Sequence, residues 1–287
     1  MRNILIITLI LSIVSCEISA VKDVSTENSE DVVGAPSSKT SSDTLKSDKS
    51  EPPVIDKKVL TNGIEIKWFT HGNGVDIQDG DMVEIDYKVS LEDGKIVDGN
   101  YLLKHKSFPF MVGFNMQTEG WDLALNQMRV GDHAEIFIPS ELARGEKGIK
   151  GLIPPNANNI LNIKCLSKKE PGRTLEGGTR VWLMREELAN TNRFNKGKKI
   201  IFHSWVSSTS NPRYYNTENV GRPISYEWKD EGLTPGLKKA LLGAKRSDLM
   251  LVHVPSSEAY GVKGFKDLVK PNEDLLYRIW VMDIEDK

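Results

Sequence analysis

Alternating apolar and polar residues mark several strands in the middle of the chain. Residues 82–89 read MVEIDYKV and lead into an Asp-Gly turn within LEDGK, a combination typical of a β-hairpin. The stretches HAEIFI (133–138) and ILNIKCL (160–166) alternate in the same way. These patterns predict an antiparallel sheet.

One segment of this region has helical spacing instead. In residues 120–128 the large apolar side chains Trp121, Leu125 and Met128 fall on one face, and Val130-Gly131 follows as a helix stop. We therefore expect an α+β fold in which an antiparallel β-sheet wraps around one short α-helix.

The chain contains an internal repeat. At an offset of 116 residues, 14 of the 37 positions in 120–156 are identical to those in 236–272 without a gap, whereas chance would give about two. The sequence therefore predicts two tandem domains, which we call the first copy (57–169) and the second copy (170–287).

The N-terminus reads as an export leader. An eleven-residue apolar run (4–14) follows Arg2 and is too short to cross a bilayer as a stable helix. Its end, IVSC, resembles the bacterial lipobox, which makes residues 1–16 a signal peptide with Cys16 as the lipidated residue. The alternative is a plain secretory signal that is cut after Ala20.

Residues 17–56 are polar and low in complexity, with almost no aliphatic clustering. Such a composition cannot bury enough apolar surface to order the chain. We expect a disordered linker that holds the folded part away from the membrane.

The charge balance, the cysteine count and the histidine spacing argue against several kinds of function. The 38 lysines and arginines nearly balance the 40 aspartates and glutamates, giving a net charge of −2, so nothing favours nucleic-acid binding. The two cysteines, Cys16 and Cys165, cannot form a disulfide framework, and Cys165 is expected to be buried on a strand. The five histidines are isolated, so we expect no metal and no cofactor.

The order of motifs in the first copy resembles the FKBP family of peptidyl-prolyl cis-trans isomerases. The resemblance rests on the LEDGK hairpin followed by Asp98, the Gly-Trp pair at 120–121, V-G-D at 130–132 and I-P-P at 153–155. The second copy resembles the same family through GLTPGLKKALLGAKRSD and VPSSEAYG, and it has diverged further. The resemblance implies two tandem FKBP-like domains that act on proline-containing polypeptides.

Carried over by motif, the resemblance also implies a pocket in the first copy. The residues implied for catalysis are Tyr87, Asp98, Phe108, Thr118, Trp121 and Ile153, and those implied for substrate binding are Val97, Phe110, Gln117, Arg144, Leu152 and Leu161. Five of these depart from the family pattern: Val97, Gln117, Thr118, Arg144 and Leu161. Arg144 stands where the family has a tyrosine, and a cation at the rim can occlude an apolar pocket or select clients with acidic residues near the proline.

The second copy keeps less of the family pocket. The residues implied there are Tyr215, Tyr226, Leu237, Tyr260 and Tyr277. Leu237 stands where the first copy has Trp121, Ser204 where it has Tyr87, and Asn216 where it has Asp98. Losing the indole, the phenol and the carboxylate together implies an inactive pocket.

The functional expectation is therefore an exported, lipid-anchored peptidyl-prolyl cis-trans isomerase that assists folding outside the cytoplasm. Its active site would be in the first copy, where the departures from the family pattern could weaken the activity. The protein would face the periplasm or the cell exterior. The alternative is a noncatalytic FKBP-like chaperone or client-binding lipoprotein.

Overall fold

The computed structural model describes residues 52–186, 191–229 and 231–286. The expected leader with Cys16, and nearly all of the expected linker, lie outside the described residues. Strand β1 begins at Asp56, the last residue of the expected linker.

The first copy forms a seven-stranded antiparallel sheet in the order β1-β2-β6-β7-β3-β4, with β5 paired to β3. Its strands are β1 (Asp56–Val59), β2 (Glu65–Thr70), β3 (Met82–Ser90), β4 (Ile96–Gly99), β5 (Phe108–Met111), β6 (His133–Ile138) and β7 (Asn159–Lys168). Its helix is α1 (Glu119–Leu125), and short 3₁₀ turns occupy Asn100–Leu103, Ser140–Leu142 and Gly145–Lys147.

The second copy forms a seven-stranded antiparallel sheet in the order β11-β10-β14-β13-β9-β8, with β12 paired to β10. Its strands are β8 (Arg173–Thr174), β9 (Arg180–Arg185), β10 (Lys198–Ser208), β11 (Tyr215–Asn216), β12 (Ile224–Glu227), β13 (Leu249–Val254) and β14 (Leu275–Asp286). The helices are α2 (Thr217–Val220) and α3 (Pro235–Leu241), with 3₁₀ turns at Ser256–Glu258 and Gly261–Lys263.

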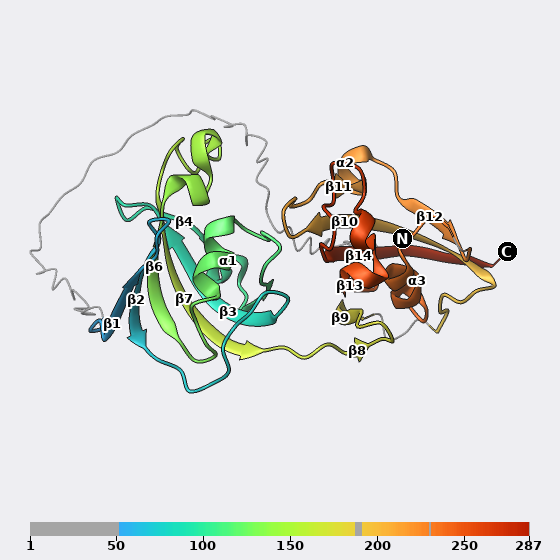
Figure 1. Cartoon of the computed structure of the whole chain (residues 1–287), viewed down its shortest axis with the longest axis horizontal. Coiled ribbons are helices and arrows are strands. Elements are labelled where there is room, and N and C mark those ends of the chain that lie inside the picture. Colours follow the sequence, from blue (N-terminus) through green and yellow to red (C-terminus); the bar gives the residue numbers. More distant parts are fainter. Residues whose placement is uncertain (1–51, 187–190, 230, 287) are drawn as a thin grey trace, which may run out of the picture. The chain divides into compact units, whose positions relative to one another are not determined.

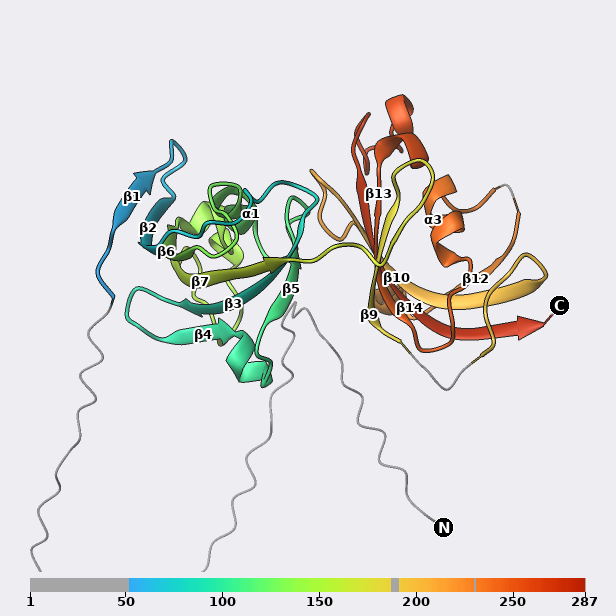
Figure 2. The same cartoon turned by 90° about the horizontal axis from the view of Figure 1, so that it is seen from below.

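The two sheets have the same topology. Read from the β8 edge, the second order matches the first strand for strand, and the off-path strands β5 and β12 pair with corresponding strands. Each sheet curves around one short helix, α1 in the first copy and α3 in the second (Figure 1; Figure 2). The expected α+β class is confirmed. None of the helices in the described residues is long and apolar enough to cross a membrane.

The strands predicted from alternation are present. The turn after β3 is closed by hydrogen bonds from Leu91 N–H to the Lys95 carbonyl and from Gly94 N–H to the Leu91 carbonyl, both 2.9 Å.

Cys165 lies on β7, is 1% exposed and is a free thiol. Burial raises the pKa of this thiol to about 12.

Helix α1 is shorter than its pattern predicts. It ends at Leu125 rather than Met128. The chain after Leu125 continues with tighter bonds, from Gln127 N–H to the Ala124 carbonyl and from Met128 N–H to the Leu125 carbonyl, both 2.9 Å. Met128 is still buried, so its burial reflects this turn and not an extra turn of α-helix.

A glycine lets each helix approach its sheet closely. A Cβ atom on Gly120 would lie 2.4 Å from Ile138 Cγ2 and 2.8 Å from the Leu142 carbonyl oxygen. Gly236, its counterpart on α3, would meet Thr179 Oγ1 at 2.4 Å and Val254 Cγ1 at 2.6 Å. The glycine at this position of the repeat is therefore required by helix-to-strand packing.

Asp122 on α1 is a buried carboxyl. It is 7% exposed, one oxygen accepts a 2.7 Å hydrogen bond from Asn115 N–H, and Oδ1 has no partner in the described part of the chain. Burial raises the pKa of Asp122 to about 7, and the negative charges of Asp79 and Glu119 act in the same direction.

The raised pKa predicts that the Asp122 carboxyl contributes less to stability at neutral than at mildly acidic pH. In the unfolded chain an aspartate titrates near pH ~3.9, so between about pH 4 and 7 the folded state binds more protons and the free energy of unfolding falls as pH rises, by a few kcal/mol in all. We predict that Asp122→Asn reduces the difference in unfolding free energy between pH 5 and pH 8, as measured by denaturant titration.

The matched control is Asp86→Asn, at a carboxyl whose side chain is 45% exposed. It should leave the pH dependence unchanged. An Asp122→Asn chain with the wild-type pH dependence would contradict the assignment.

Candidate functional site

Four aromatic side chains meet between the sheet and helix of the first copy. Trp121, on α1, packs edge-on against Tyr87 at 5.1 Å between ring centroids and stacks on Phe110 at 5.5 Å. Phe108 contacts Tyr87 edge-on at 5.9 Å. All four are at most 4% exposed. Strands β3 and β5 and helix α1 thus bring together four of the predicted residues.

A carboxylate joins this aromatic cluster through Tyr87. The Tyr87 hydroxyl donates to Asp98 Oδ1 at 3.3 Å, and Gly99 N–H donates to the same oxygen at 2.7 Å. Burial raises the pKa of Asp98, whereas these two hydrogen bonds and the charge of Arg144 lower it. Burial also raises the pKa of Tyr87, with Asp98 adding to the effect, so Tyr87 stays a neutral donor.

Arg144 is tied to Gln117, the residue two before helix α1. Its Nη2 donates to Gln117 Oε1 at 2.8 Å and its Nη1 to the Gln117 carbonyl at 3.3 Å. Burial lowers the pKa of Arg144, and the negative charge of Asp98 opposes this effect. Two residues that depart from the family pattern are therefore linked to each other.

The other predicted residues of the first copy lie on elements beside the cluster. Val97 precedes Asp98 on β4, Leu161 is fully buried on β7, and Ile153 is 5% exposed. Thr118 caps the start of α1 and is 7% exposed, and its hydroxyl has no partner among the described residues. Leu152 is half-buried, and its carbonyl accepts a bond from Lys95 Nζ at 3.3 Å.

The turn that carries Leu152 and Ile153 is held by its own backbone. Ile149 and Ile153 exchange hydrogen bonds of 2.7 and 2.8 Å. Gly148 has a φ of +53°, and a Cβ there would lie 2.3 Å from the Ile153 carbonyl oxygen. Gly264 has the same geometry against Val269 in the second copy, which explains why the repeat keeps this glycine.

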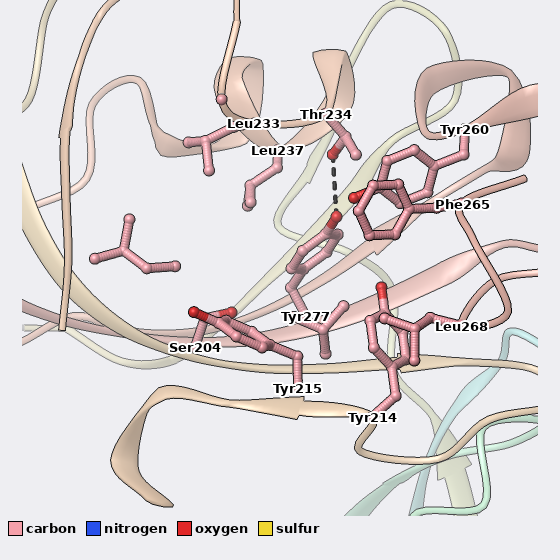
Figure 3. Close-up of a pocket in the computed structure, with 13 residues that line it drawn as sticks. Ser204, Tyr214, Tyr215, Leu233, Thr234, Leu237, Tyr260, Phe265, Leu268 and Tyr277 are labelled. Atoms are coloured by element: carbon pink, nitrogen blue, oxygen red, sulfur yellow. Dashed lines mark hydrogen bonds between the residues drawn. The ribbon is translucent and has the colours of Figure 1, made fainter. Parts of the chain in front are cut away.

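The second copy contains an open pocket of about 340 Å³ at the corresponding place. Figure 3 shows Tyr214, Tyr215 and Tyr277 reaching it from the sheet side, and Leu237 and Thr234 from α3 and the residue before it. Tyr260 and Phe265 stack at 4.7 Å on another side. The residues that line it are Ser204, Val206, Tyr214, Tyr215, Ile224, Gly232, Leu233, Thr234, Leu237, Tyr260, Phe265, Leu268 and Tyr277, none of them charged.

One hydrogen bond ties the floor of this pocket to the helix start. Thr234 Oγ1 and the Tyr277 hydroxyl lie 3.2 Å apart (Figure 3). Tyr277 occupies the place of Leu161 in the repeat, and Thr234 that of Thr118. The threonine hydroxyl at this position therefore has a hydrogen-bond partner in the second copy, whereas the Thr118 hydroxyl of the first copy has none among the described residues.

Tyr226 does not line the second-copy pocket, contrary to the prediction. It is 3% exposed within the core of that copy, and its hydroxyl donates to the Lys229 carbonyl at 2.9 Å. Its ring is used for core packing against Phe194, at 6.4 Å between centroids.

Strand register corrects a second correspondence. Asp98 pairs with Val89, and in the second copy Tyr215 pairs with Val206, which is the counterpart of Val89. Tyr215 and not Asn216 therefore stands in the place of Asp98. Asn216 instead caps helix α2, its Oδ1 accepting from Glu218 N–H at 2.8 Å.

The sequence reasoning also missed Tyr214, Thr234 and Phe265 in the second-copy pocket. A signal existed for Thr234, because at the offset of 116 it matches Thr118, whereas Phe265 matches Ile149, which was not among the predicted site residues. A signal existed for Tyr214 as well, because it precedes Tyr215 as the predicted residue Val97 precedes Asp98, at the offset of 117 that relates Ser204 to Tyr87. Within the described residues, no group of three or more His, Cys, Asp or Glu side chains could hold a metal ion.

Known proteins resemble this chain in both copies. The model of the family "FKBP-type peptidyl-prolyl cis-trans isomerase" matches residues 74–166 and again 190–282. FK506-binding protein 4 of Gibberella zeae is 35% identical over 124 residues, which are 43% of this chain and 24% of that protein. Peptidyl-prolyl cis-trans isomerase Mip of Coxiella burnetii is 32% identical over 126 residues, 44% of this chain and 52% of that protein.

Longer but weaker matches cover both copies. Human peptidyl-prolyl cis-trans isomerase FKBP10 is 24% identical over 211 residues, 74% of this chain and 35% of that protein. A crystal structure of the three FKBP domains of wheat FKBP73 is 22% identical, with a TM-score of 0.39, and covers 79% of this chain and 97% of that one. The matched part thus spans about half or less of the length of each of these three curated relatives. On the two matches to its model, the chain belongs to the FKBP-type peptidyl-prolyl cis-trans isomerase family, with two tandem domains.

Proposed function

We propose that the first copy catalyses cis/trans isomerisation of X-Pro bonds in polypeptides outside the cytoplasm. The observation that carries the proposal is the cluster of Tyr87, Phe108, Phe110 and Trp121 with Asp98 hydrogen-bonded at its edge. Uncatalysed X-Pro isomerisation takes tens to hundreds of seconds, slow enough to limit folding.

The reaction suits a site built of aromatic walls and few polar groups. The barrier of about 18 to 20 kcal/mol comes from the double-bond character of the C–N bond. A pocket lowers it by binding the twisted amide, which is less conjugated, more tightly than the planar one. No proton transfer or metal is needed. Phe108, Phe110 and Trp121 supply apolar wall, and Asp98 with Tyr87 orients the bound peptide.

Arg144 supports a weakened or selective site. Its two bonds to Gln117 place a half-buried cation beside the start of α1, at the position where the second copy has Tyr260. A prolyl segment that displaces Gln117 must offer Arg144 another acceptor, and an acidic client residue does so best. The same link favours the second candidate function, a chaperone that binds proline-bearing segments without turnover.

Export and a lipid anchor complete the proposal. The short apolar run ending in IVSC supports lipidation of Cys16, and the polar linker supports a tethered domain. The second copy, with Leu237 and Ser204 in place of Trp121 and Tyr87, supports binding and not catalysis at its pocket.

Exchanging residues between the copies tests catalysis. Trp121→Leu installs the residue that the second copy uses, and we predict that it lowers kcat/KM toward Xaa-Pro peptides at least about tenfold, because the ring that packs on Tyr87 and Phe110 is lost. Arg144→Tyr should raise kcat/KM. The measurement is an NMR exchange assay on peptides that vary in the residue before proline.

Arg144→Tyr should raise turnover of apolar Xaa-Pro peptides more than that of Glu-Pro peptides. A wild-type chain that binds these peptides without accelerating exchange would contradict catalysis and leave the chaperone function.

The proposed role of Asp98 predicts a shift in its titration. Because the Tyr87 hydrogen bond lowers the pKa of Asp98, Tyr87→Phe should move that pKa further upward. An NMR pH titration of the Asp98 carboxyl carbon checks this. Tyr101→Phe, at a tyrosine that is 49% exposed, is the control and should cause no shift. An unchanged Asp98 pKa in Tyr87→Phe would show that the hydroxyl does not interact with the carboxylate in solution.

The anchor is tested separately at Cys16. We predict that Cys16→Ser abolishes incorporation of an alkyne-tagged fatty acid and moves the exported chain from the membrane to the soluble fraction. If the mature wild-type protein instead begins at Val21, the segment is an ordinary secretory signal and the anchor is refuted.

A further inference from the structure

The second copy has a cavity separate from the pocket of Figure 3. It measures about 250 Å³ and lies beside β9. Val181, Leu183 and Met250 form apolar wall, and Arg173, Lys245 and Asp248 are among its polar residues. We call it the β9 cavity. The activity proposed for the first copy does not use it.

The corresponding position of the first copy holds a buried carboxylate with a full set of hydrogen-bond donors. Asp132, the counterpart of Asp248, is 2% exposed and accepts three hydrogen bonds. They come from Trp68 Nε1 at 3.0 Å, Gly72 N–H at 2.7 Å and Arg129 N–H at 3.1 Å. A buried carboxylate in this fold is thus satisfied in part by an indole N–H.

Asp248 is buried to the same degree and has fewer donors. It is 3% exposed, and among the described residues only Lys245 N–H donates to it, at 2.8 Å to Oδ2. Its Oδ1 is buried with no hydrogen-bond partner in the described chain. An unsatisfied buried acceptor of this kind is costly and calls for a donor.

The missing donor is the indole. Trp68 on β2 pairs with Ala134, and at the corresponding register Leu183 on β9 pairs with Met250. Both strands carry an irregularity at the next residue, which confirms the correspondence. Trp68 is 4% exposed, whereas Leu183 is 39% exposed. The second copy therefore has a smaller, uncovered side chain where the first has a buried tryptophan.

The strand that covers this place is also shorter in the second copy. Strand β1 pairs with β2 over four residues and reaches Trp68 through Asp56. Strand β8 pairs only Arg173 with Val181 and Thr174 with Arg180. Within the described chain no strand pairs with the outer edge of β9 beyond Val181. Such an edge can accept an extended segment of another polypeptide.

The charges at the cavity suit an aromatic ring with a polar N–H. The guanidinium of Arg173 is held by the Ala240 and Leu242 carbonyls at 2.7 and 3.0 Å, and Lys245 Nζ pairs with Glu186 at 2.6 Å. Cations beside a partly buried site attract the face of an aromatic ring, and Trp gives the strongest such contact.

We propose that the β9 cavity binds a tryptophan side chain of a partner polypeptide. The indole N–H donates to the Asp248 carboxylate as Trp68 donates to Asp132, and the partner's chain runs along the open edge of β9. The volume is sufficient, since an engineered apolar cavity of about 150 Å³ in another protein binds benzene. The second copy thereby becomes a recognition module for tryptophan-bearing segments.

The test uses the full chain and N-acetyl-5-fluorotryptophan amide, followed by ¹⁹F NMR so that the protein's own tryptophans do not interfere. We expect saturable binding with one site per chain. The 1-methyl analogue cannot donate the N–H and should bind at least about tenfold more weakly, as expected for a lost bond to a charged acceptor.

Leu183→Trp gives the cavity an indole of its own and should reduce probe binding at least tenfold. Leu166→Trp, at a leucine of β7 that is 46% exposed, adds a tryptophan elsewhere and should leave binding unchanged. Absence of binding at millimolar probe, or equal affinity for the 1-methyl analogue, overturns the proposal without requiring any variant to fold. Unchanged binding in a folded Leu183→Trp chain overturns it as well.

Discussion

The contact between the Trp121 indole and the rings of Tyr87 and Phe110 is the interaction on which the first copy depends. It joins the helix to strands β3 and β5, and it is possible only because Gly120 lets the helix approach Ile138. The same contact orients Tyr87, whose hydroxyl holds Asp98. Helix packing and the polar edge of the candidate site are therefore one arrangement, and a change at Trp121 acts on both.

Alternation and repetition were enough to predict most of the fold. The period-two pattern located β3, β6 and β7, since one face of each strand is buried, and the repeat implied a second sheet. The end of α1 could not be predicted, because Met128 is buried by a tight turn that mimics helical spacing. Asn216 was also misplaced, by one residue: the offset of 117 that relates Ser204 to Tyr87 gives Tyr215 for Asp98, and strand pairing agrees with it.

The sequence predicted the candidate site best where a large aromatic side chain stands at a motif position. Trp121, Tyr87 and Phe108 are large, buried and mutually packed, so motif positions located them. Tyr226 was misjudged because an aromatic ring serves core packing as well as a pocket wall. The link between Arg144 and Gln117 was not visible, because it joins residues 27 positions apart through side chains that both depart from the family pattern.

The duplicated copies diverge by exchanging tryptophan for leucine at two separate places. Leu237 stands for Trp121 beside a 340 Å³ pocket, and Leu183 stands for Trp68 beside a 250 Å³ cavity. In each case the smaller side chain stands beside open space, and at Leu183 the buried carboxylate of Asp248 also lacks the indole donor that Trp68 gives to Asp132. A second domain that retains the sheet is free to change in this way, since the sheet order is unchanged.

The buried thiol of Cys165 has a practical and a biological consequence. Because burial raises the pKa of this thiol to about 12, the reactive thiolate is scarce at neutral pH. Cys165 is therefore inert toward disulfide exchange and alkylating reagents while its strand stays folded. In an oxidising environment Cys165 would therefore not cross-link two folded molecules through a disulfide. A cysteine introduced on the surface of either copy could be given a spectroscopic label without Cys165 reacting with the same reagent.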